Sequence, residues 1–203
     1  MADSLVLSHA EIEFLLQWRP PEHIAIRELL DLGSDDRREY TVKVGLASLL
    51  ARGLCVRVGD GSVAPSPKLS QVVDGLSTAR IGTRAFGRAD RRNVLVHIVH
   101  GPDGSLALFP AGPDRFAVAA LDQSVAFVEQ LTRFVDSCQT SKERSTVVIQ
   151  AITSADRVGI ALVTDESGAW FVSDSEESPD RATPSTRRQA IRRIQELLPI
   201  AGN

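Results

Sequence analysis

The sequence predicts an α/β (α+β) protein, with a helical, winged-helix-like part over residues 1–79 and a duplicated antiparallel sheet with packed helices over residues 80–203. Three observations predict this class. Apolar residues recur at helical spacing before Ala79, and they alternate with polar residues after it. The order strand, turn, strand, turn, strand, helix then occurs twice, which divides the sheet region into quasi-twofold halves over 80–136 and 145–199.

The N-terminal part combines helices with one hairpin. Ser8 and Glu11 have the spacing of a capping box, which predicts a helix that ends at Pro20 and Pro21. The glycines in 59–61 predict a tight turn. Further helices are predicted over 23–32, from 34–36 to 53, and over 66–76, and strands over 54–58 and 62–64. The order helix, helix, hairpin, helix approximates a winged helix.

The two halves of the sheet region are predicted from their turns. Residues 101–104 form a strong turn signal, and hairpin-length turns exclude parallel crossovers within each half. Asp122 is expected to cap one helix, and Thr183 and Pro184 to begin another with proline at its first position. Strands are predicted over 80–86, 93–99, 105–109, 146–152, 158–164 and 169–173, with an edge strand over 116–119. The helices, over 122–135 and from 183–184 to Pro199, are expected to cover one face of the sheet.

Composition argues against several classes of protein. The chain of 203 residues carries a net charge of -3, so it has no global basic field for nucleic acid or membranes. Cys55 and Cys138 are too few for a disulfide framework, and both are expected to be reduced and buried. The first residues lack the features of a signal peptide, and no apolar run approaches a membrane span. A cytoplasmic protein is the simplest interpretation. Arginine supplies 20 of the 23 basic residues, as expected from a high-GC genome.

No motif predicts catalysis, a metal site or a cofactor. His97 and His100 lie three residues apart, so on one strand they point to opposite faces. His9 and His23 are expected to be surface or capping residues. The glycine turns lack the context of a phosphate-binding loop, and no serine or cysteine lies in a nucleophile elbow. The chain is therefore predicted not to be an enzyme.

Arginine forms two clusters. The first surrounds a loop between two predicted strands and supplies the candidate partner-binding residues, which suit an acidic partner: Arg84, Arg88, Arg91 and Arg92. The second lies on the last helix and is expected to form its solvent face: Arg187, Arg188, Arg192 and Arg193. Within that helix, Arg192 and Glu196 have the spacing of an ion pair.

Two other functions remain open. A DNA-binding regulator would use the N-terminal part, but the expected recognition helix, 41–52, is largely apolar, and Asp60 offsets Arg57 in the hairpin. A small-molecule sensor or enzyme would need a pocket between the halves that contains His97.

Short motifs resemble one family. LLARGLCVRVGDGSVAPSPKLSQVVDGLSTARIGTRAF resembles the passage from the N-terminal helices into the first strand of the EspG proteins, cytosolic chaperones of mycobacterial type VII secretion. RRNVLVHIVHGPDGSLALFP is similar to their first-half strands. VGIALVTDESGAWFVSDSEES and RQAIRRIQELLP resemble their closing hairpin and last helix. The resemblance covers about 40–135 and 145–199.

The resemblance implies a quasi-twofold fold in one compact domain of an actinobacterial protein. It also implies a non-catalytic chaperone or adaptor that binds a PE–PPE-like secretion substrate. The family places a long helical segment between its halves, whereas here a short polar linker, 137–145, fills that position. The shorter linker would expose more of the sheet, so we expect a homodimer or a complex with a protein partner.

Overall fold

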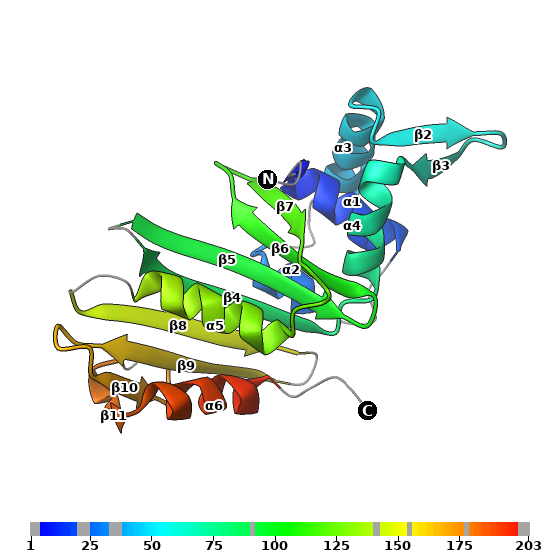
Figure 1. Ribbon diagram of the computed structural model, residues 1–203. Helices are drawn as coiled ribbons and strands as arrows, with labels where there is room; N and C mark the ends of the chain where they lie inside the picture. The colour runs from blue at the N-terminus through cyan, green and yellow to red at the C-terminus, as the bar shows by residue number, and fades with distance from the viewer. Residues whose placement is uncertain are drawn as a thin grey trace.

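A nine-stranded antiparallel sheet with the order β1-β7-β6-β5-β4-β8-β9-β10-β11 forms the centre of the protein (Figure 1). The computed structural model describes residues 5–19, 25–32, 38–89, 92–139, 143–153, 156–176 and 179–198. The strands are β1 (Leu5–Ser8), β4 (Ile81–Ala89), β5 (Arg92–Gly101), β6 (Gly104–Pro110), β7 (Arg115–Ala120), β8 (Ser145–Ile152), β9 (Arg157–Thr164), β10 (Trp170–Ser173) and β11 (Thr183–Ser185). The predicted fold class is confirmed.

Six α-helices, the short 3-10 helix η2 (Pro179–Arg181) and a separate hairpin complete the described elements. The helices are α1 (His9–Trp18), α2 (Ala25–Leu29), α3 (Arg38–Ala51), α4 (Pro67–Ser77), α5 (Phe127–Cys138) and α6 (Arg187–Leu197). The hairpin pairs β2 (Cys55–Val58) with β3 (Ser62–Pro65), and it projects from the body of the protein beside α3 (Figure 1).

The expected quasi-twofold architecture is centred on the pair β4 and β8. These strands run antiparallel, with Gly82 opposite Ile152 and Phe86 opposite Val148. From this pair, β5, β6 and β7 step outward in one direction, and β9, β10 and β11 step outward in the other. A helix follows each set, α5 after the first and α6 after the second. The repeating unit therefore contains four strands and a helix, with β4 corresponding to β8. The predicted repeat contained only three strands.

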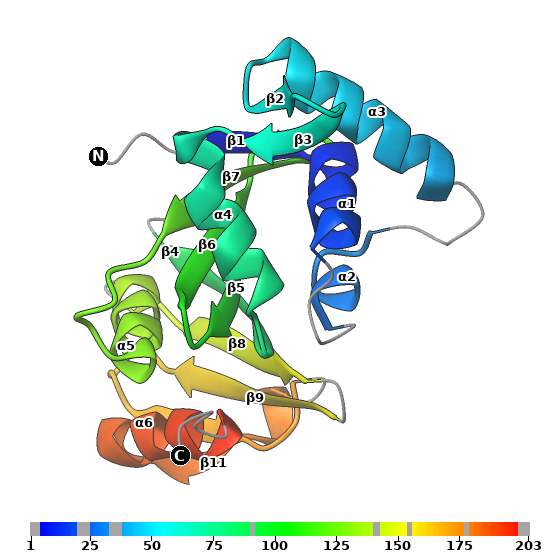
Figure 2. The ribbon, with the colours of Figure 1, turned by 90° about the vertical axis from the view of Figure 1, so that its right-hand side faces the viewer.

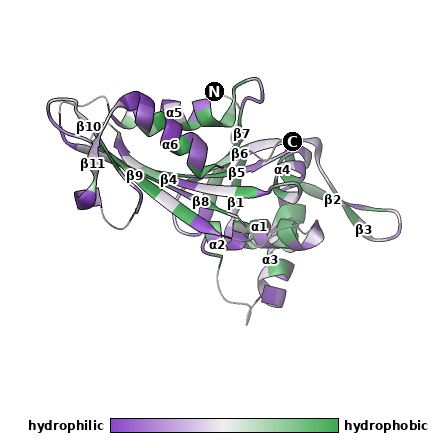
Figure 3. Ribbon diagram, turned by 90° about the horizontal axis from the view of Figure 1, so that it is seen from below, coloured by the Kyte–Doolittle hydropathy of each residue, from purple (hydrophilic) through white to green (hydrophobic). Residues whose placement is uncertain are grey.

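Helices cover both faces of the sheet, at opposite ends. On one face α5 and α6 bury alternate residues of the central strands, among them Ala85, Ile149 and Leu162. On the other face α1 and α4 pack over β1, β7, β6 and β5, where Leu108 and Val118 are buried, and α2 packs against β4. Seen from below, α5 and α6 lie on one side of the strands and α1 to α3 on the other (Figure 3). The face opposite α5 and α6, which was expected to be available to a partner, is covered in part by the N-terminal helices.

Three local predictions also differ from the structure. Strand β1 pairs with β7, so the strand at 116–119 is not at the edge. Asp122 does not cap α5, which begins after Ala126; its carboxylate accepts from the amide of Ser124 within a turn. Pro184 lies in β11, the last strand of the sheet, where the absence of an N–H group is tolerated.

Helix α6 begins later than predicted because Thr186 provides a better cap. Its hydroxyl accepts from the Gln189 amide, and the Gln189 side chain accepts from the Thr186 amide. This reciprocal capping box satisfies two donors at the start of the helix.

The buried carboxylate of Glu11 joins three N-terminal elements. It accepts from the Ser8 amide at the start of α1, and from Ser48 and Arg52 at the end of α3. Arg52 also donates to the carbonyl oxygen of Val6 on β1, at 2.8 Å. Burial raises the pKa of Glu11, but these hydrogen bonds and the Arg52 charge outweigh it, so the pKa lies below its ordinary value. The carboxylate is therefore held ionised in the fold.

We expect Glu11→Gln to lower the free energy of unfolding by about 2 kcal/mol. Arg52 then loses its charged acceptor. Ser8 and Ser48 donate to different oxygens of Glu11, and one of these is replaced by an amide NH2 group that cannot accept. Urea unfolding at neutral pH measures the change. Glu39→Gln is the matched control, since Glu39 is exposed and pairs with Lys43 on its own helix. Equal effects of the two substitutions would show that Glu11 is not a structural anchor.

Candidate functional site

Part of the sheet carries apolar side chains that belong to neither core. On the face of the N-terminal helices, Leu95, Phe86 and Val148 lie opposite one another across β5, β4 and β8. Phe86 is 42% exposed, and Leu95, Val148 and Phe171 are half-buried. We call these four residues the Phe86 surface. Neither core cluster includes these four residues. The short 3-10 helix η2 (Pro179–Arg181) lies against β9 and against β10, the strand that carries Phe171. Phe86 is consequently the member that is most accessible to another molecule.

The structure brings two of the four candidate arginines to this surface. Arg84 and Arg88 lie two residues on either side of Phe86, and alternation along β4 therefore places them on the same face. Arg92 is paired with Ala89, so it lies on the opposite face. Arg91 lies outside the described residues. The predicted cluster is thus split between the faces, because strand direction reverses within it.

Arg84 and Arg88 differ in their environment. Arg88 is exposed. Arg84 is half-buried, and its Nη2 donates to the carbonyl oxygen of Leu29 at 2.7 Å and to Asp31 at 3.2 Å. Arg84 therefore fastens α2 and the turn after it to the sheet, whereas Arg88 provides a positive charge at the other end of the Phe86 surface.

A polar row crosses the sheet beside the Phe86 surface. His97, Arg84, Gln150 and Gly159 lie opposite one another on four adjacent strands. A carboxylate oxygen of Glu176 lies 1.7 Å from the position that a Gly159 Cβ would occupy, so a larger residue there would displace the Glu176 side chain. Within the described residues, one polar atom of each side chain in the row is buried without a hydrogen-bond partner: Arg84 Nε, His97 Nδ1, Gln150 Oε1 and Glu176 Oε2. Ordered water is the simplest group that would satisfy them.

His97 and His100 have separate environments, as their spacing predicts. His97 is 4% exposed, and burial, followed by the nearby Arg84 charge, lowers its pKa to about 4. Its imidazole is therefore neutral at neutral pH. His100 lies on the other face, with its ring stacked on Phe127 and Nδ1 2.6 Å from the hydroxyl of Ser105. Sequence spacing separated the two histidines, but Gln150 and Glu176 could be placed beside His97 only from the strand register.

Metal ligands do not gather in the described part of the chain, where no group of three or more histidine, cysteine, aspartate or glutamate side chains could hold an ion.

Cys55 and Cys138 are buried free thiols, as predicted, and burial raises the pKa of each. Among the helices that the structure describes, none has the length and apolar character needed to cross a membrane.

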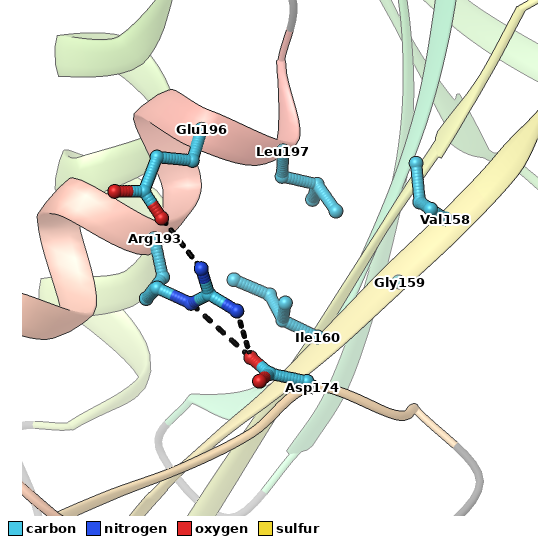
Figure 4. A pocket seen from close by; sticks show the side chains of 7 residues that line it. All are labelled: Val158, Gly159, Ile160, Asp174, Arg193, Glu196 and Leu197. Atoms are coloured by element: carbon cyan, nitrogen blue, oxygen red, sulfur yellow. Dashed lines mark hydrogen bonds and ion pairs between the residues drawn. The ribbon is translucent and has the colours of Figure 1, made fainter.

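The hollow between β9 and α6 is occupied by an internal ion pair. Arg193 donates to Asp174 and, at 2.6 Å, to Glu196, and its guanidinium lies between the helix and the strand (Figure 4). Glu196 therefore pairs with Arg193 rather than with Arg192, its predicted partner. Arg187 binds Asp136 on α5. These contacts give two arginines of the second cluster a structural role.

The charges on α3 give little support to DNA binding. Lys43 is bound by Glu39 at 2.6 Å, and Arg52 is bound by Glu11 at 2.7 Å. Phosphate recognition needs basic side chains that can exchange counterions for phosphate oxygens. The pairing of these two cations within the protein reduces the positive charge that this region offers to phosphate.

Compared with protein-family models and with curated proteins, the chain matches none. The resemblance to EspG proteins therefore stays a prediction from short motifs.

The neutral imidazole of His97 is expected to make the fold sensitive to acid. The folded pKa of about 4 is lower than the ordinary 6.5, so the unfolded chain takes up a proton first. This contribution to stability is complete above pH 6.5 and falls by up to about 3 kcal/mol as the pH drops toward 4.

His97→Leu removes the titrating group, so we expect a shallower loss of stability over that pH interval in urea unfolding. Gln150→Leu is the control, because it removes a neighbouring polar group that does not titrate. If the free energy of unfolding fell equally with pH in the wild type and in His97→Leu, His97 would not be the source of the acid sensitivity.

Proposed function

We propose that the chain is a non-catalytic adaptor or chaperone that binds a protein partner through the Phe86 surface. One observation carries the proposal: Phe86 is a large aromatic side chain, 42% exposed, in the interior of a long central strand. Burying the part of this side chain that is still exposed contributes about 1 kcal/mol. Its half-buried neighbours on adjacent strands extend the apolar contact.

The proposed partner has an apolar stripe with acidic residues beside it. Phe86, Leu95 and Val148 supply an apolar row, and Arg88 adds an exposed positive charge at one end. An amphipathic helix can lay one apolar face along such a row. The resemblance to EspG proteins supports a helical secretion substrate of the PE–PPE kind as that partner.

Phe86→Asp places a charge in the centre of the surface, and we expect it to weaken partner binding by at least tenfold. Val158→Asp is the matched control, because Val158 is 44% exposed and lies on the opposite face of the sheet. The wild type and the two variants are each used as bait in the native host, and the recovered proteins are identified by mass spectrometry. The affinity of each form is then measured with the purified partner. Circular dichroism verifies that each variant is folded.

Two outcomes would overturn the proposal. Either the wild type enriches no protein with an acidic, amphipathic helix, or Phe86→Asp retains the affinity of Val158→Asp for the purified partner.

A further inference from the structure

Helix α3 is apolar on two sides. Toward α1 it buries Gly45 and Leu49, and Gly45 approaches so closely that a Cβ would lie 1.9 Å from the carbonyl oxygen of Ala10. On the outer side, Tyr40 is 72% exposed and Val44 is 41% exposed. A helix with one buried side normally exposes polar residues on the other. The outer side of α3 therefore has the composition of a contact surface.

Four of the exposed residues of α3 form a continuous apolar stripe, beside the exposed ion pair of Glu39 and Lys43. Its members are separated by four, three and four residues, and all are exposed: Tyr40, Val44, Ala47 and Ala51. This spacing is the one that brings apolar residues of two packed helices together along a seam. None of the four carries a charge. Figure 2 shows α3 at the outer margin of the protein, where a second helix can approach it.

The hairpin after α3 adds to the apolar area. Val56 and Val58 on β2 are exposed, and β2 begins four residues after the last residue of α3. Of the eight large hydrophobic side chains that are exposed in the described residues, four lie on α3 and β2. The concentration of apolar exposure on this short stretch distinguishes it from scattered surface residues.

We propose that α3 is a homodimer interface, in which two copies of the chain pack their α3 helices antiparallel about a twofold axis. The order of residue sizes in the stripe selects this occupant. A twofold axis level with the Gly45–Leu46 peptide places Val44 opposite the second copy's Ala47, and Tyr40 opposite its Ala51. Each large side chain then faces a small one, so the helices can approach closely without overpacking.

A parallel arrangement lacks this fit. It places Tyr40 against the second copy's Tyr40 and Ala47 against its Ala47, which leaves large residues in conflict and small ones separated by a gap. Packing of like helices by a closed twofold axis also buries the same stripe on both copies. The stripe is therefore complementary to itself in one orientation.

This inference is independent of the proposed partner site. The α3 stripe lies at the end of the protein that carries the hairpin, whereas β4 and β8 lie at the centre of the sheet (Figure 1). Phe86→Asp is expected to leave dimerisation unchanged, so failure of one proposal is distinguishable from failure of the other.

Sedimentation velocity of the full chain, from about 1 to 100 μM, tests the dimer. The wild type is expected to sediment as a dimer at the upper concentrations, and Val44→Glu to raise the dimer dissociation constant at least tenfold. Val158→Glu is the control, since it adds the same charge at an equally exposed valine outside the stripe. A monomeric wild type over this range, or equal effects of the two variants, would overturn the proposal.

Disulfide formation tests the register. Chains carrying Val44→Cys are mixed with chains carrying Ala47→Cys, and rapid formation of the mixed disulfide is expected because these positions lie opposite each other. Tyr40→Cys mixed with Ala47→Cys is the control, which the register separates by about one helical turn. The native cysteines are buried and do not compete. Equal yields in the two mixtures would contradict the antiparallel register.

Discussion

The arrangement of the N-terminal helices depends on one buried carboxylate. Glu11 is 1% exposed, and its partners come from α1, from α3 and, through Arg52, from the backbone of β1. A buried charge is tolerated only where donors replace water, so these elements must keep their positions for Glu11 to remain ionised. Arg52 also donates a hydrogen bond to the carbonyl oxygen of Val6 on the outer strand β1. Because this acceptor is already bound, β1 is less able to pair with a further strand. One side chain thereby joins the helical part to the sheet.

The attachment of α2 determines how much of the sheet remains open. Leu29 packs on Gly82, where a Cβ would lie 3.1 Å from its side chain, and its carbonyl oxygen accepts from Arg84. The helix cannot extend over Phe86 without losing these contacts. The apolar row of the Phe86 surface begins two residues beyond Arg84, and Phe86 itself stays 42% exposed. The exposed phenylalanine is thus a consequence of where the N-terminal helices are anchored.

Local sequence signals predicted the central elements because their turns and periodicity are strong. They missed β1, whose four residues are too few to establish alternation, and β11, where Pro184 imitates the start of a helix. The candidate site was harder to predict from the sequence. Alternation along a strand predicts that Arg84 and Arg88 lie on the same face, but only the register across β4, β5 and β8 places Gln150 beside Arg84. Contacts between distant strands depend on the whole sheet, which no local pattern records.

The α3 stripe and the Phe86 surface differ in the kind of occupant that each can accept, and we therefore propose different roles for them. In the proposed dimer the α3 stripe fits a second copy because its two large residues face two small residues across the twofold axis. The Phe86 surface has no such self-complementarity: its large side chains are central, and the charge of Arg88 would face the same charge if two copies met there. An acidic, apolar partner relieves that repulsion. A dimer joined at α3 would present two Phe86 surfaces, and a partner with two binding segments would gain affinity from the second contact without new chemistry.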